Sequence, residues 1–277
     1  MAMTLDDPLD PDLIRANLKT RRIGRSLLVY ERTASTNDVA GHCARGADSD
    51  GLVVFTEEQT AGRGRTGATW LSRAGESLLF SFVLLDFKAG NELLSLACAV
   101  GVAEAIGQVG GHQAGIKWPN DVMLDGKKVA GILVESRLVA WDAKRQSRAT
   151  GDGARVTTIV GIGINCHQSR EAFPDQIRNT ATSLDLVGGT TCQRVTVAKR
   201  VLTSLDHWID VAERNSQQVV ETWSRLSTQL NQRVALSYNG KSFVGNCIGV
   251  DPENGLILQL DRGGVRMFDA AHTHRVR

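Results

Sequence analysis

Continuous apolar runs and apolar residues at helical spacing take turns along the first 230 residues of the chain. Three apolar runs predict buried strands: 51–55, 77–85 and 157–165. The last run is apolar throughout, so we expect it at the centre of a sheet. Three segments with a period near 3.6 residues predict helices that cover this sheet with one face: 91–108, 195–213 and 216–230.

Shorter patterns mark further elements. A capping aspartate and a first-turn proline within residues 10–18 predict a short helix, and a strand is expected at 26–30. Residues 122–135 predict a hairpin with its turn at Asp125-Gly126. The polar stretch from Arg137 to Arg155 predicts a long surface loop with solvated basic residues.

The pattern changes near residue 231. Short strand-like runs follow, separated by Asn239-Gly240, Asn254-Gly255 and Gly263-Gly264. Many short strands with turn residues between them are typical of a small barrel. We therefore predict two domains, residues 1–230 and residues 231–277, with the small domain packed on the large one.

Composition narrows the class of protein. The chain has 277 residues, of which 42% are hydrophobic and 22% charged, and a net charge of +2, too balanced to indicate nucleic-acid binding. Its five cysteines form no Cys-x-x-Cys motif, so neither a disulfide framework nor a zinc site is expected. The N-terminus does not resemble a signal peptide, and the apolar runs are short for a membrane span. We expect a soluble protein of the reducing cytoplasm, with no membrane partner.

Residues 58–70 form the chemically richest stretch. Gly62, Gly64 and Gly67 allow close approach of a ligand to the backbone, and Arg63 and Arg65 add fixed positive charge. The stretch spells G-x-G-x-x-G, but it leads into a strand rather than a helix, which does not fit a dinucleotide site. It predicts a phosphate-binding loop, and the alternative is a solvated hairpin loop.

Several polar side chains lie within or next to apolar strands, where polar residues are unusual and can indicate a function. They are Gln59, Arg63, Arg65, Lys117, Asn120, Asp121, Lys128 and Asn165. Together they supply cations, an Asn/Asp pair suited to Mg²⁺ or phosphate, and a glycine-floored apolar sheet. The pattern predicts an elongated apolar ligand with a carboxylate, activated by a nucleoside triphosphate. Two alternatives stay open: Lys128 as an edge-strand lysine with a solvated head, and Ser35-Thr36-Asn37 as a helix cap rather than a ligand site.

The chain resembles the biotin protein ligases. The motifs that carry the resemblance are Ser35-Thr36-Asn37, Gln59-Thr60-Ala61-Gly62-Arg63-Gly64-Arg65 with Trp70, Lys117-Trp118-Pro119-Asn120-Asp121, Lys128 to Glu135, and Gly161-Ile162-Gly163-Ile164-Asn165. The resemblance implies an α+β catalytic domain of the class II aminoacyl-tRNA-synthetase type and a C-terminal SH3-like barrel. It also implies two steps: biotin and Mg·ATP form biotinyl-5′-AMP, and a lysine of a biotin carboxyl carrier domain then takes the biotinyl group.

The resemblance also implies roles for single residues. Lys128, Arg65 and Lys117 would be catalytic, Asp121 would hold Mg²⁺, and two groups of residues would bind the substrates. Biotin would contact Ser35, Thr36, Asn37, Gln59, Gly62, Arg63, Gly64, Arg65, Lys128, Gly131, Ile132, Gly161 and Gly163. The nucleotide would contact Arg63, Arg65, Trp70, Lys117, Asn120 and Asn165.

The resemblance also implies an acceptor for biotin, and the chain differs from many relatives at a few positions. The implied acceptor is the carrier protein or domain of acetyl-CoA carboxylase or a related carboxylase, and relatives include monomers and homodimers. Few residues precede the first strand, so we expect no DNA-binding module and no repressor activity. Thr66 and Ala68 stand where many relatives have basic residues, which leaves the tightness of loop closure open. The rival functions are a lipoate–protein ligase, whose Arg-Arg-x-x-Gly-Gly-Gly type of loop is absent here while Gly62-Arg63-Gly64-Arg65 is present, and a non-catalytic small-molecule sensor.

Overall fold

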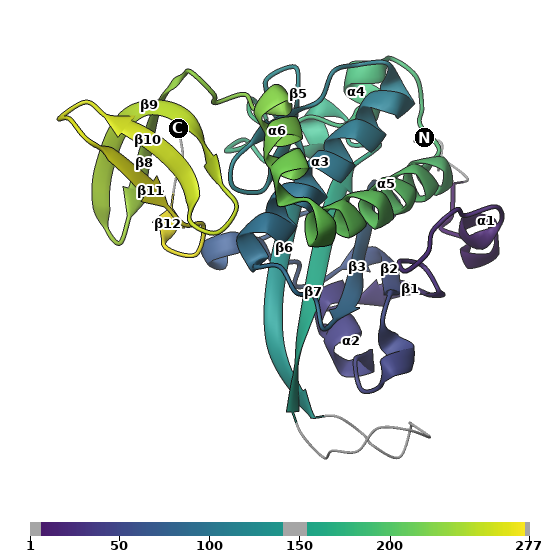
Figure 1. Ribbon diagram of the computed structural model, residues 1–277. Helices are drawn as coiled ribbons and strands as arrows, with labels where there is room; N and C mark the ends of the chain where they lie inside the picture. Colours follow the sequence, from purple (N-terminus) through teal and green to yellow (C-terminus); the bar gives the residue numbers. More distant parts are fainter. Residues whose placement is uncertain (1–6, 141–153, 275–277) are drawn as a thin grey trace.

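A seven-stranded sheet forms the centre of the larger part of the molecule in a computed structural model that describes residues 7–140 and 154–274 (Figure 1). The strands, in their order across the sheet, are β1 (Ser26–Thr33), β2 (Leu52–Gln59), β3 (Ser77–Leu85), β7 (Ala154–Asn165), β6 (Lys127–Ala140), β5 (Asp121–Leu124) and β4 (Gly115–Lys117). β1 and β2 are parallel, and the other neighbours pair antiparallel. β7 lies in the middle, as its apolar sequence predicts.

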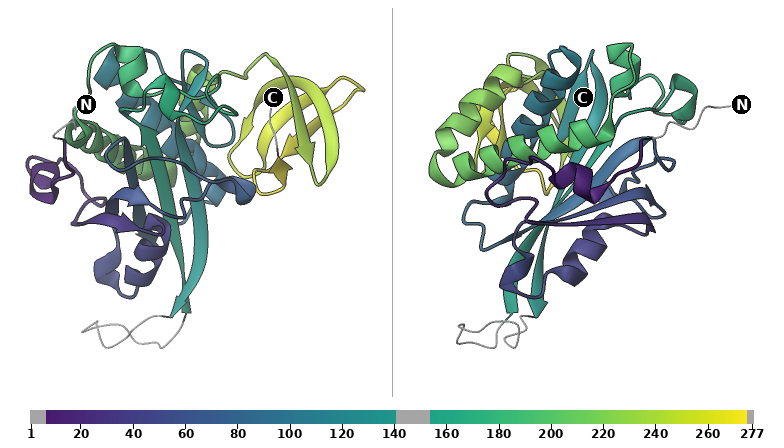
Figure 2. Two further views of the ribbon diagram at one scale, coloured as in Figure 1. Left: turned by 180° about the vertical axis from the view of Figure 1, so that it is seen from behind. Right: turned by 90° about the vertical axis from the view of Figure 1, so that its right-hand side faces the viewer.

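Three helices cover one face of this sheet: α3 (Asn91–Gly110), α5 (Arg194–Arg214) and α6 (Ser216–Leu226). Figure 2 shows them as one layer on one side of the sheet. Their apolar faces join alternate strand residues, such as Phe80, Phe82 and Ile162, in the main core. α3 is apolar enough over Asn91–Val109 to cross a membrane by length and composition, but 72% of that window is buried. Its apolar sequence reflects packing against both the sheet and α5.

The opposite face is covered in part by α2 (Thr36–Cys43). Ala40 and Ala44 pack there against Val54, Val83 and Ile159 in a second, smaller core. The pocket described below lies beside the N-terminus of α2 and over parts of β6 and β7. The short helices α1 (Pro11–Arg15) and α4 (Leu184–Gly188) complete this part of the fold.

The C-terminal strands form a separate antiparallel sheet, drawn in yellow-green in Figure 1. Its order is β11 (Val265–Phe268), β10 (Gly255–Leu260), β9 (Lys241–Asp251), β8 (Arg233–Tyr238) and β12 (Thr273–His274). Leu236, Cys247, Leu258 and Phe268 are buried within it. The sheet begins two residues after Asn231, and the predicted domain boundary there stays a prediction.

Two sequence-based expectations need correction. Arg137 to Ala140 belong to β6, and Ala154 and Arg155 belong to β7, so the predicted loop is wrong at both ends. Its remainder, residues 141–153, lies outside the described residues. The helix expected at 216–230 ends at Leu226. The other predicted helices and strands are present with small shifts of their ends.

Candidate functional site

A cavity of about 310 Å³ opens between the N-terminus of α2, the Gly-Arg loop (residues 60–70) and the ends of β5, β6 and β7. It gathers motifs that are far apart in the sequence. The predicted site residues that line it are Ser35, Thr36, Asn37, Gln59, Arg63, Gly64, Arg65, Trp70, Lys117, Asn120, Asp121, Lys128, Gly131, Ile132, Gly161 and Gly163. The lining therefore holds four cationic side chains and one carboxylate.

Glycines form the floor of the cavity because larger residues do not fit there. Side chains alternate along a strand, so Gly131 pairs with Gly163 and Leu133 with Gly161 on the same face. A Cβ on Gly163 would lie 2.5 Å from Trp70 Cε2, and a Cβ on Gly161 would collide with Asn37 Oδ1. Trp70 thus packs against the floor, whereas the sequence-based prediction expected it to cover a nucleotide.

The start of α2 supplies the polar wall at one end. Thr36 donates its backbone N–H and its hydroxyl to Gln59 Oε1, at 2.8 and 3.1 Å. Ser81 Oγ, on β3, lies 2.5 Å from Asn37 Oδ1. Ser35 occupies the N-cap position, but its side chain makes no capping hydrogen bond. Within the described part of the chain, the Ser35 hydroxyl and the Gln59 amide nitrogen make no hydrogen bond, so both can meet a ligand.

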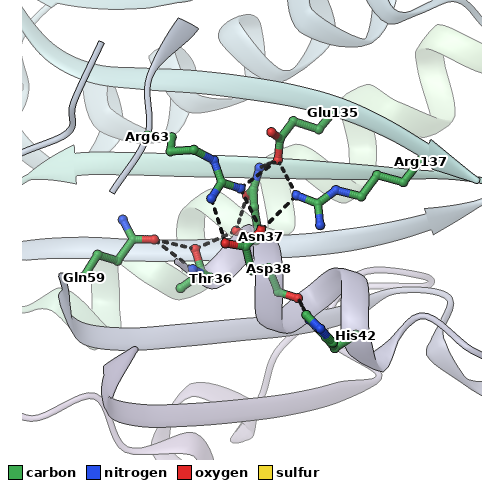
Figure 3. A network of polar contacts seen from close by, with 9 residues as sticks. Thr36, Asn37, Asp38, His42, Gln59, Arg63, Glu135 and Arg137 are labelled. Atoms are coloured by element: carbon green, nitrogen blue, oxygen red, sulfur yellow. Dashed lines mark hydrogen bonds and ion pairs between the residues drawn. The ribbon is translucent and has the colours of Figure 1, made fainter. Parts of the chain in front are cut away.

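Four charged side chains form a balanced cluster beside this wall (Figure 3). Arg63 donates two hydrogen bonds to Asp38, at 2.7 and 2.8 Å, and Arg137 Nη2 donates one to Asp38 Oδ1, at 3.0 Å. Both arginines also contact Glu135 Oε2, at 3.4 and 3.1 Å. We call Asp38, Arg63, Glu135 and Arg137 the charge cluster. The hydrogen bond from Arg63 contributes most to lowering the pKa of Asp38 to about 2.

The charge cluster connects the loop to the ligand wall. Glu135 Oε2 also accepts a hydrogen bond of 2.6 Å from Asn37 Nδ2. Arg63 is thus bound to Asp38 and Glu135 rather than free to meet an anion, which differs from the role predicted for it. Its position suggests that it fixes the loop next to Thr36 and Asn37.

Arg65 connects the loop to the C-terminal sheet. Its Nη2 donates to the backbone oxygens of Ala270 and Thr273, the latter at 3.3 Å. Burial lowers the Arg65 pKa, and the nearby carboxylates of Glu92, Asp121 and Asp269 oppose this effect. Thr273 and His274 of β12 also line the cavity. The C-terminal sheet is therefore part of the site.

The cationic end of the cavity lies over β4, β5 and β6. Lys128 Nζ lies 2.5 Å from Asp121 Oδ1 and 5.6 Å from the centre of a Trp70 ring. Asn120 Nδ2 donates to Ile132 O at 2.8 Å, which fixes the turn after β4. Among residues 7–140 and 154–274, Lys117 has no ion-pair partner within 4.0 Å. Lys117 and Lys128 are the cations best placed to meet an anionic ligand.

Two predicted site residues lie elsewhere. Asn165 is 5% exposed and donates to Thr182 O at 2.9 Å, so its side chain supports the chain behind the floor instead of lining the cavity. Gly62 does not line the cavity either. Its oxygen accepts the Trp70 N–H at 3.0 Å, which closes the base of the loop.

The sequence-based prediction missed Asp38, Arg137, Thr273 and His274. Asp38 directly follows the Ser-Thr-Asn motif, and an acidic residue one position after a ligand motif is a signal that could have been used. Arg137 lay in a segment interpreted as loop. Thr273 and His274 carry no local signal, because their place depends on how the two sheets pack.

Comparisons with known proteins find relatives along most of the chain. A model of the Biotin/lipoate A/B protein ligase family matches residues 29–144. The bifunctional ligase/repressor BirA of Bacillus subtilis is 31% identical over 262 residues, covering 93% of this chain and 76% of the relative. The biotin–[acetyl-CoA-carboxylase] ligase of Mycobacterium tuberculosis is 31% identical over 271 residues, covering 93% and 94%.

Solved structures give the same result for the fold. The structure of a biotin protein ligase from Aquifex aeolicus in complex with biotin and ATP superimposes with a TM-score of 0.74 and 25% sequence identity. The match covers 91% of this chain and 99% of that one, so it includes both sheets.

Proposed function

Because this chain belongs to the biotin protein ligase family, we propose that its cavity joins biotin to ATP as biotinyl-5′-AMP and then passes the biotinyl group to a carrier lysine. The predicted family, enzyme class and α+β fold are confirmed. The assignment of each residue to a role is our proposal. The observation that carries it is one cavity with a glycine floor, an amide-and-hydroxyl wall and a cationic end.

The floor and wall suit biotin. Trp70 and Asn37 pack against Gly131, Gly161 and Gly163 where Cβ atoms would otherwise lie, and the apolar chain of biotin would lie along the surface that these side chains form. The Gln59 amide nitrogen and the Ser35 hydroxyl, which make no hydrogen bond to residues 7–140 or 154–274, would bind the polar ureido group. Asn37 is held by Ser81 and Glu135, so it would act as a fixed wall of the slot.

The cationic end suits the chemistry. The biotin carboxylate must attack the α-phosphorus of ATP, and both groups are anionic. Lys117 and Lys128 would offset their repulsion and stabilise the charge that develops in the transition state. Arg65 is the third residue predicted to be catalytic. To bind phosphate, its guanidinium would have to give up its hydrogen bonds to the carbonyl oxygens of Ala270 and Thr273. No protein nucleophile is required, because the reaction depends on positioning and electrostatics.

Mg²⁺ is implied by the triphosphate substrate, and the residues present fit it in part. Asp121 is the only carboxylate among the described residues that line the cavity. Mg²⁺ commonly uses one or two carboxylates together with phosphate oxygens and water. Asp121 pairs with Lys128, so holding the ion would require that pair to open. The metal supplies charge neutralisation of the triphosphate when bound.

The acceptor and the setting follow from the relatives' names. Two relatives are biotin–[acetyl-CoA-carboxylase] ligases, so we propose the carrier domain of that carboxylase, or of a related one, as the acceptor. All five cysteines are free thiols, which supports action in the reducing cytoplasm. The absence of repressor activity and the choice between monomer and homodimer stay predictions.

Pyrophosphate release with ATP and either biotin or lipoate tests the proposal against its nearest rival. The matched family includes both ligase types. We expect release with biotin and not with lipoate. Release with lipoate alone would contradict the proposal, and release with neither acid would favour the non-catalytic sensor.

A further inference from the structure

Three potential metal ligands meet just beyond the end of β7, outside the cavity. One donor atom each from His167, Asp185 and Cys192 lies within 4.8 Å of the other two. His167 Nδ1 is 2.7 Å from Asp185 Oδ2 and 4.0 Å from Cys192 Sγ. The three residues come from separate segments: the turn after β7, helix α4 and the loop before α5.

The surroundings orient these ligands as in known metal sites. His167 Nε2 lies 3.1 Å from Asp7 Oδ2, so Nδ1 is the ring nitrogen that faces Asp185 and Cys192. A metal-bound histidine usually donates its second nitrogen to a carboxylate in this way. Asp7 is itself held by the backbone N–H of Arg194 at 2.9 Å. Cys192 N donates to Asp185 Oδ1 at 2.8 Å, which fixes that carboxylate.

We propose that His167 Nδ1, Asp185 Oδ2 and Cys192 Sγ bind a zinc-type divalent ion. Nitrogen, sulfur and carboxylate oxygen are the ligand set that Zn²⁺ accepts, with bonds of about 2.0–2.3 Å. The His167 side chain is only 3% exposed and that of Asp185 is 21% exposed, and Cys192 is partly buried. A water molecule would complete the coordination of the ion.

The competing interpretation is a buried ion pair. Burial alone would lower the His167 pKa, but hydrogen bonds to Cys192, Asp185 and Asp7 raise it to about 9. A protonated ring between two carboxylates would fill the place of the metal. Because a metal must displace that proton and the thiol proton, the two interpretations exclude each other and can be separated by experiment.

The role of such an ion would be structural. It would join α4 and the start of α5 to the end of the floor strand, two residues beyond Asn165. This inference does not depend on the proposed function. The spacing could not reveal it, because Asp185 and Cys192 lie 18 and 25 residues from His167 and form no Cys-x-x-Cys motif.

Cobalt substitution tests the proposal on the full-length, reduced and chelator-treated protein. We expect one Co²⁺ per chain with thiolate-to-cobalt charge-transfer absorption in the near ultraviolet, abolished by added Zn²⁺. Zn²⁺ at about 100 times its Kd should raise the Tm by roughly 5–10 °C. Cys192→Ser should lose the absorption and most of the Tm rise. Cys43→Ser, a partly buried cysteine outside the cluster, should keep both.

Wild-type protein with neither absorption nor Tm rise would refute the metal site and leave the buried ion pair. Absorption that persists in Cys192→Ser would also refute it. If Cys192→Ser does not fold, the cobalt stoichiometry of the wild type decides: one bound ion supports the site, and none refutes it. Biotin-dependent pyrophosphate release is measured on the same samples, so failure of the proposed function is seen separately.

Discussion

Lys128 Nζ lies 2.5 Å from Asp121 Oδ1, across the hairpin of β5 and β6. The side chains are 35% and 27% exposed, and a pair in contact with water is worth roughly 1 kcal/mol or less. A substrate carboxylate or phosphate can therefore compete for the lysine. The pair directs Lys128 into the cavity while leaving it available.

Replacing Lys128 with alanine should remove transition-state stabilisation without unfolding the protein. We expect kcat/KM for biotin-dependent pyrophosphate release to fall by roughly 10²–10³-fold, the usual effect of losing one such group. Lys127→Ala is the matched control. Lys127 directly precedes Lys128 on β6, so its side chain points to the opposite face, and it does not line the cavity. Equal activity of the Lys128→Ala variant and the wild type would remove this lysine from the mechanism.

Gly163→Ala should block the floor of the cavity. The added Cβ would lie 2.5 Å from Trp70 Cε2, so the indole must move into the slot or out of it. Overpacking of this kind costs about 1–3 kcal/mol, and we expect biotin affinity, measured by titration calorimetry, to fall roughly tenfold or more. Gly188→Ala, where an added Cβ meets nothing within 4 Å, serves as the control. Unchanged affinity in Gly163→Ala would show that biotin does not lie on this floor.

Asp38→Asn should weaken the charge cluster and thereby the placement of the Gly-Arg loop. We expect KM for biotin to rise roughly threefold to tenfold with kcat little changed, because Asp38 acts through Arg63 rather than on the substrate. Asp38→Glu should restore part of the affinity. Asp175→Asn, which breaks the exposed pair with Arg178, should change nothing. A fall in kcat with an unchanged KM would contradict this positioning role.

The low pKa of the Asp38 carboxyl predicts the pH range in which the stability of the charge cluster is insensitive to pH. Its pKa of about 2 lies below the ordinary value of 3.8, so its contribution to stability is present above 3.8 and is lost only as pH falls through about 2. The charge cluster should therefore stay intact throughout the range in which the enzyme is assayed.

Glu92→Gln should stabilise the protein at neutral pH. Burial raises the pKa of Glu92 above 4.5, although its hydrogen bond from the Ala270 N–H and the charge of Arg65 oppose this. A raised carboxyl pKa means that stability is full below 4.5 and falls as pH rises through the raised value. The glutamine keeps the acceptor oxygen without the charge. Urea unfolding should thus show a gain over wild type that grows with pH, and a gain independent of pH would contradict this explanation.

The sequence predicted those parts of the site that depend on local pattern. Apolar runs and glycine spacing indicated β3 and β7, and the motifs gave nearly all residues of the cavity. Partners joined only by tertiary packing could not be read in this way. Arg137 pairs with Asp38 across 99 positions, and Arg65 reaches Thr273 across 208. Asn165 is an opposite case. Its motif predicted a contact with the ligand, but its side-chain amide donates a hydrogen bond to Thr182 O instead.

We propose that this cavity makes biotinyl-5′-AMP and delivers biotin to a carrier lysine. The most direct measurement is mass spectrometry of an acetyl-CoA-carboxylase carrier domain after incubation with the protein, biotin and ATP. We predict the mass of one biotinyl group on a single lysine, dependent on ATP and strongly reduced with Lys128→Ala. A carrier domain that stays unmodified while the wild-type protein is folded and binds biotin would contradict the account.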